Sequence, residues 1–64
     1  MTPDEYRILT VLSLARDIPV KVVGKDKEIA EQMEAKGWVV WHGTDYGASA
    51  YKITQMGEAV LTGG

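Results

Sequence analysis

The first part of the chain carries the hydrophobic pattern of an amphipathic helix over residues 3–16. Apolar side chains recur at Ile8, Leu12 and Ala15, a spacing that brings them to one face of a helix. Further apolar residues widen this face, namely Leu9, Val11 and Leu14. A helix that is apolar on more than one side is either central to its fold or shared with a partner. We therefore expect a homodimer that forms through this helix, because Leu9, Leu12 and Leu14 cannot all face one small core.

The start of this helix is marked by a capping-box pattern. Thr2 stands at the N-cap position, Pro3 occupies the first helical position, and Glu5 follows three residues after Thr2. The helix is expected to end before Pro19, since proline disfavours helical backbone at the residue that precedes it.

Two shorter elements follow. Residues 20–23 alternate and are rich in β-branched side chains, which predicts a strand, although a single helical turn is the competing interpretation. Residues 26–36 predict a second helix, with Asp26 as its N-cap and Gly37 as the residue that ends it. Its inward face is expected to consist of Ile29, Ala30 and Met33.

Residues 38–53 have the pattern of a β-hairpin with a long loop. The period of two places Val39 and Trp41 on one face, and we expect both to be partly exposed because a hairpin leaves one face open. The alternative is that Trp41 packs against residues 20–23, as a third strand, or against a second subunit. Thr54 can cap a closing helix over 55–61, whose core side chains would be Met56, Ala59 and either Val60 or Leu61.

These elements predict a small α+β domain over residues 1–61, followed by a flexible end at 62–64. A chain of 64 residues has room for one domain, and its 45% hydrophobic and 25% charged residues are typical of globular proteins. The absence of cysteine excludes disulfides, cysteine-ligated zinc and a thiol nucleophile. No apolar run is long enough to cross a membrane, and the N-terminus is acidic where a secretory signal is basic. We expect a cytoplasmic protein.

Two segments on either side of the Gly-rich loop carry a family resemblance. Residues 33–39 read Met-Glu-Ala-Lys-Gly-Trp-Val, and residues 51–57 read Tyr-Lys-Ile-Thr-Gln-Met-Gly. Together they resemble a winged helix-turn-helix domain of small prokaryotic or phage type. The first segment is similar to the end of its recognition helix, which runs through a glycine into the wing. The second is similar to the strand that leaves the wing, followed by a capping threonine.

The resemblance implies DNA binding in transcriptional or nucleic-acid regulation, with a shortened helix-turn-helix. The stretch 18–36 is too short for two full helices, so the helix before the recognition helix is reduced to a turn at 20–23 or lost. The recognition helix carries four acids against two lysines, and the net charge of −2 opposes binding by bulk electrostatics. A second function therefore stays open, that of a protein-interaction module that modulates a host or regulatory protein.

Lysines, a glutamine and aromatic residues are the candidate contacts to DNA or to a protein partner. The lysines suit phosphate, the glutamine suits a base edge, and the aromatic side chains suit stacking. The alternative, which the balanced local charge favours for the lysines, is an ordinary solvated surface. The candidates are Lys21, Lys25, Lys27, Gln32, Trp41, His42, Tyr46 and Lys52.

No enzymatic centre is expected. His42 is the single histidine, and no cluster of metal ligands or catalytic partners surrounds it in the sequence. Ser13 and Ser49 belong to no recognisable nucleophile motif, and the Gly43–Gly47 loop lacks the lysine of a phosphate-binding loop. We therefore expect neither catalysis nor a metal or other cofactor.

Overall fold

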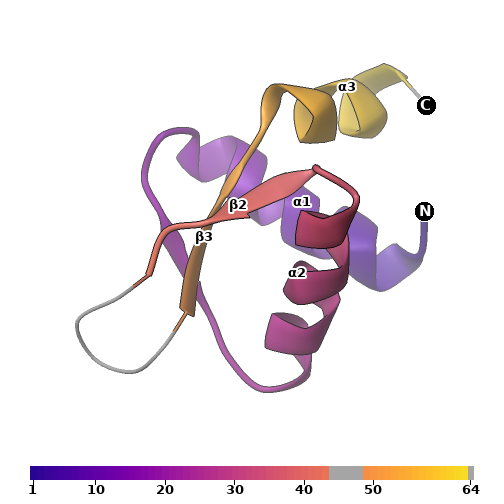
Figure 1. Cartoon of the computed structure of the whole chain (residues 1–64). Helices are drawn as coiled ribbons and strands as arrows, with labels where there is room; N and C mark the ends of the chain where they lie inside the picture. The colour runs from indigo at the N-terminus through magenta and orange to yellow at the C-terminus, as the bar shows by residue number, and fades with distance from the viewer. Residues whose placement is uncertain (44–48, 64) are drawn as a thin grey trace.

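The computed structural model describes residues 1–43 and 49–63, and it has the predicted α+β architecture with a winged-helix-like layout (Figure 1). Each predicted element is present, with bounds that differ by one or two residues. Residues 20–22 form a strand, so the helical turn considered for this segment is not adopted. The elements are α1 (Pro3–Ala15), β1 (Val20–Val22), α2 (Lys25–Ala35), β2 (Val39–Trp41), β3 (Ser49–Ile53) and α3 (Gln55–Gly63).

The three strands form one antiparallel sheet in the order β1-β3-β2, with β3 in the centre. Paired residues of neighbouring strands share a face, so the register defines two sides of the sheet. The inner face contains Val20, Val22, Val39, Trp41, Ser49, Tyr51 and Ile53. The outer face contains Lys21, Val40, Ala50 and Lys52.

The core lies between the inner face and the helices, and α1 passes behind the strands in Figure 1. Tyr51 is the largest fully buried side chain, and burial raises the pKa of its hydroxyl group. The expectation that Val39 is partly exposed is wrong, since this side chain is only 2% exposed. The helix α2 packs against β2 and brings Met33 into the same core cluster, so the inner face of the hairpin is covered.

The helix α1 begins with the predicted capping box. Thr2 Oγ1 accepts from the Glu5 amide at 3.1 Å, and the Thr2 amide donates to Glu5 Oε1 at 2.8 Å. The helix ends at Arg16, which adopts a φ of 54°. As expected, the three leucines of this helix do not all face the core, since only Leu9 and Leu12 are buried. Leu14 alone among them faces solvent.

The helix α2 begins one residue before the predicted start, and Asp26 is not its N-cap. Gly24 takes that position with a φ of 64°, and no side chain caps the helix. The Asp26 carboxylate instead accepts two hydrogen bonds from the Arg7 guanidinium, at 2.8 and 3.2 Å. This bond holds the pKa of the Asp26 carboxyl below its ordinary value. The Asp26 carboxylate therefore binds a side chain of α1 and does not cap the helix to which it belongs.

Thr54 caps α3 as predicted, and it also joins the helix to the start of the hairpin. Its Oγ1 accepts from the Gly57 amide at 3.0 Å and donates to the Gly37 carbonyl at 2.6 Å. The Thr54 amide donates to the Trp38 carbonyl at 3.0 Å. The two segments that carry the family resemblance are thus hydrogen-bonded to each other.

The core contacts expected of α3 are partly wrong. Met56 and Ala59 are exposed, whereas Gly57 is buried and Leu61 packs against the core cluster. The reason is the close approach of α3 to the Trp38 carbonyl, which leaves room only for a residue without a side chain at the contact point. Within the described residues, no helix is long and apolar enough to cross a membrane.

A buried carboxylate links α1 to the end of α2. Glu5 is 5% exposed, and its Oε2 lies 2.9 Å from Lys36 Nζ. The same ammonium group lies 4.6 Å from the centre of the Trp38 ring, where a cation–π contact is favourable. The amide of Thr2 and then Lys36 hold the pKa of Glu5 below its ordinary value.

Replacing this carboxylate is expected to change how stability depends on pH. A lowered pKa means that Glu5 stabilises the fold at neutral pH, and that this contribution is lost as the pH falls through the folded-state pKa. We expect the melting temperature of the wild type to fall on acidification, and to fall less in Glu5→Gln. Thermal melts at a series of acidic pH values measure the difference. Glu28→Gln, on the exposed surface of α2, is the control and should follow the wild-type profile.

Candidate nucleic-acid interface

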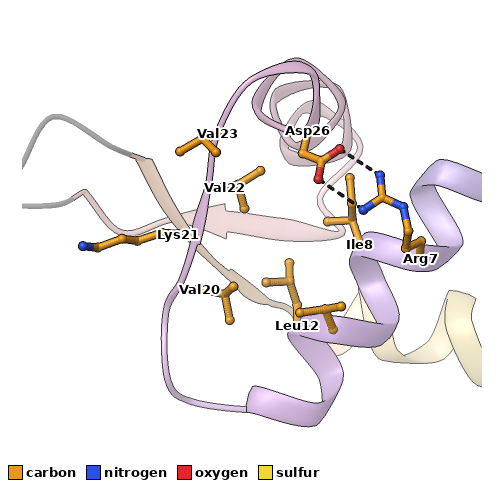
Figure 2. A pocket seen from close by; sticks show the side chains of 9 residues that line it. Arg7, Ile8, Leu12, Val20, Lys21, Val22, Val23 and Asp26 are labelled. Carbon is orange, nitrogen blue, oxygen red and sulfur yellow. Dashed lines mark hydrogen bonds and ion pairs between the residues drawn. The ribbon is translucent and has the colours of Figure 1, made fainter.

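The outer face of the sheet brings together two of the predicted lysines. Lys21 pairs with Ala50, which lies two residues from Lys52 on β3, so the two lysines are diagonal neighbours on one face. Figure 2 shows the Lys21 side chain pointing away from Arg7 and Leu12, to the side not covered by the helices. The outer face therefore presents two ammonium groups from adjacent strands.

His42 extends this face beyond the end of β2. Its amide donates to the Ala50 carbonyl at 2.8 Å, so it continues the pairing of β2 with β3. Its side chain is exposed, and so is that of Val40, which pairs with Lys52. Among the residues described on the outer face of the three strands, none carries a carboxylate. The face is thus basic at its centre, with an imidazole at one end.

Trp41 is exposed, as one of its two predicted positions required. By register it belongs to the inner face, yet 53% of its surface is accessible to solvent. Its ring lies beside Gly43, since a Cβ built on that glycine would come within 3.2 Å of Trp41 Cη2. The alternative position against residues 20–23 is not adopted, because β1 pairs with β3 rather than with β2. Tyr46 lies outside the described residues.

The remaining candidates lie on α2, away from the outer face. They are Lys25, Lys27 and Gln32, all of which are exposed. The helix that carries them packs on the inner face of the sheet, through Ala30 and Met33. Its exposed surface also contains Glu28 and Glu31. The predicted contact residues therefore form two groups, one basic on the sheet and one of mixed, largely acidic character on α2.

The sequence alone did not reveal a pocket between α1, β1 and the start of α2 (Figure 2). Its volume is about 130 Å³, and it is lined mainly by aliphatic side chains of α1 and β1. Arg7 and Asp26, which bind each other, border it. Val11, which in the sequence only widens the apolar face of the first helix, lines this pocket.

Within residues 1–43 and 49–63, no group of three acidic or histidine side chains is placed to hold a metal ion. In the comparisons with known proteins, the chain matches no protein-family model, no curated protein and no solved structure. Its function is therefore inferred from the arrangement of its own side chains.

Proposed function

We propose that this protein is a small winged-helix-like regulator of prokaryotic or phage type, and that it binds nucleic acid with the outer face of its sheet. The observation that carries the proposal is the placement of Lys21 and Lys52 as diagonal neighbours, with no carboxylate among the described residues of that face. Lysines near phosphates release counterions, and this release supplies much of the affinity of such proteins for nucleic acid.

The helix α2 is less suited to phosphate than the sheet. Of its four acids, Asp26 is bound to Arg7, and Glu34 Oε2 accepts from the Trp41 amide at 3.3 Å. Glu28 and Glu31 remain on the exposed surface of the helix. Carboxylates brought close to a nucleic-acid backbone would repel it, so insertion of α2 into a groove is disfavoured.

Two exposed rings at the end of β2 favour a single-stranded or unpaired target, although the register places Trp41 on the inner side of the sheet. Trp41 exposes half of its surface at the end of β2, and His42 follows it on the outer face. A base that is not paired can stack on such a ring, and stacking of this kind tolerates any sequence. We therefore expect tighter binding to single strands than to a duplex of the same length.

The double variant Lys21→Gln/Lys52→Gln tests the basic face. We expect it to bind a labelled oligonucleotide more weakly. The slope of the logarithm of the binding constant against the logarithm of the salt concentration is negative, and we expect it to become shallower by about 1 to 2, because two phosphate contacts are lost. Fluorescence anisotropy over a salt series measures both quantities, for one single-stranded and one duplex oligonucleotide. The matched control is Lys25→Gln/Lys27→Gln, which changes the net charge equally and should keep the wild-type slope.

The wild type must bind at low salt for this proposal to stand. If neither oligonucleotide binds, or if the α2 control weakens binding as much as the sheet variant does, the outer face is not the contact surface.

The second candidate function is a protein-interaction module, which the acidic surface of α2 and the exposed Trp41 favour. Carboxylates suit a basic protein surface, and exposed tryptophan is frequent at the centre of protein interfaces. The variant Glu28→Lys/Glu31→Lys separates the two candidates in the same assay. If only this variant binds the oligonucleotides, the acids of α2 exclude nucleic acid and the interaction module is favoured.

A further inference from the structure

The side of α1 that faces away from the core carries aliphatic residues. Val11 and Leu14 are 47% and 81% exposed, and Ile18, in the turn after the helix, is 70% exposed. The spacing of three residues places Val11 and Leu14 on one side of the helix, and Ile18 follows shortly after the helix end at Ala15. Charged and polar side chains normally occupy this side of a surface helix. Val11, Leu14 and Ile18 therefore form an exposed apolar patch, of the kind that another molecule can cover.

The pocket between α1, β1 and α2 adjoins this patch, and Val11 belongs to both. Its volume of about 130 Å³ leaves room for one branched aliphatic side chain. Figure 2 shows Arg7 and Asp26 at one end of the pocket, joined by two hydrogen bonds. Val23, at the end of β1, lines the pocket and is 66% exposed. Arg7 and Asp26 thus satisfy each other, and apart from Lys21 the remaining lining is aliphatic.

We propose that a second copy of this chain docks on the patch, with two-fold symmetry, so that Leu14 of each copy inserts into the pocket of the other. A protruding side chain and an apolar pocket lie next to each other on one side of one helix. A two-fold axis between them brings each to its counterpart, which is the self-complementary geometry of a symmetric dimer. The two α1 helices then run antiparallel, and their dipoles are favourably opposed.

The exposed apolar area is that of a small, weak dimer interface. An aliphatic side chain has roughly 100 Å² of apolar surface to bury, so the four exposed residues offer on the order of 300 Å² per copy. Two copies bury about 600 Å² from these side chains, which is less than the roughly 1,000 Å² of a stable specific interface, so we expect a weak dimer that forms only at high concentration. The residues that contribute are Val11, Leu14, Ile18 and Val23.

The dimer leaves the proposed nucleic-acid surface accessible. Lys21 also lines the pocket, but its side chain points away from Arg7 and Leu12 (Figure 2), towards the outer face on which Lys52 lies. The dimer is therefore tested with the protein alone, without nucleic acid. The result does not depend on whether the protein binds nucleic acid.

Sedimentation velocity of the full chain, from low to high micromolar concentration, tests the proposal. We expect the wild type to shift from a monomer of 7.0 kDa towards twice that mass. Leu14→Glu should remain a monomer with an unchanged melting temperature, because Leu14 makes little contact within its own chain. Leu14→Met should still dimerise. The matched control is Val40→Glu, an equally drastic change on the outer face of the sheet, which should dimerise like the wild type.

The insertion itself is tested by isotope-filtered NOE spectroscopy on a mixture of labelled and unlabelled protein. We expect contacts between the Leu14 methyl groups of one subunit and Val20 or Val23 of the partner subunit. A wild type that stays monomeric at high concentration would overturn the proposal. So would a dimer that Leu14→Glu leaves intact, or one in which the filtered contacts involve the sheet instead.

Discussion

Gly57→Ala is expected to destabilise the protein by about 3 kcal/mol or more, which for a domain of this size removes most of its stability. A Cβ on Gly57 would overlap the Trp38 carbonyl oxygen and would lie 2.9 Å from Ile53 Cγ1. The backbone oxygen cannot move aside, because the Thr54 amide is hydrogen-bonded to it. The start of α3 would have to separate from the hairpin, and the contact of Leu61 with the core would be weakened.

Chemical denaturation followed by circular dichroism measures this loss. Gly63→Ala is the matched control, since Gly63 lies in the same helix and a Cβ there meets nothing within 4 Å. We expect the control to be neutral or slightly more stable, because alanine favours helix by up to about 1 kcal/mol over glycine. Equal stability of the two variants would show that α3 does not approach Trp38 in the way described.

Thr54→Val is expected to cost about 2 to 3 kcal/mol, although valine has nearly the same shape. The change removes one hydroxyl group that serves two backbone groups, the Gly57 amide and the Gly37 carbonyl. A partly buried donor and acceptor would both lose their partner, and each loss costs about 1 kcal/mol or more.

Thr54→Ser is the control for this prediction, because serine keeps the hydroxyl group. We expect it to retain most of the stability in the same denaturation experiment. A serine variant as unstable as the valine variant would assign the effect of Thr54 to its methyl group rather than to its hydrogen bonds.

The elements of the fold were predictable because their signals are local. The capping box of Thr2 and Glu5 involves residues three apart, and its geometry follows from the sequence pattern alone. Gly37 ends α2 with a φ of 84°, a conformation that glycine adopts at little cost. Except at residues 20–23, where a helical turn stayed possible, the class of each element followed from such short-range patterns, with small errors at the ends.

The errors concern contacts between residues distant in the sequence. Asp26 has the chemistry of an N-cap, but Arg7, nineteen positions earlier, binds its carboxylate. The hydrophobic pattern could not decide whether Leu9 or Leu14 faces the core, since both only widen the apolar face that Ile8, Leu12 and Ala15 define. Their exposed fractions of 0% and 81% follow from where β3 and α2 contact the helix.

The candidate interface was predictable as a set of residue types but not as a surface. The sequence gives no reason to group Lys21 with Lys52 rather than with Lys25, which is closer along the chain. The grouping follows from the register of β1 on β3, which places Lys21 opposite Ala50 and so next to Lys52 on the same face. The same strand, which the sequence left between two interpretations, is therefore the element that defines the proposed site.

The hydrogen bond from the Trp41 amide to Glu34 has a consequence for solubility. β2 is an edge strand, and its pairing with β3 through His42 and Trp38 directs the Trp41 amide away from the sheet. An edge strand with open amides is a template on which another chain can add a strand and start aggregation. The Glu34 carboxylate accepts a hydrogen bond from this amide and places a negative charge beside the strand. The acidity of α2, which opposes DNA binding, thus protects the hairpin from edge-to-edge association.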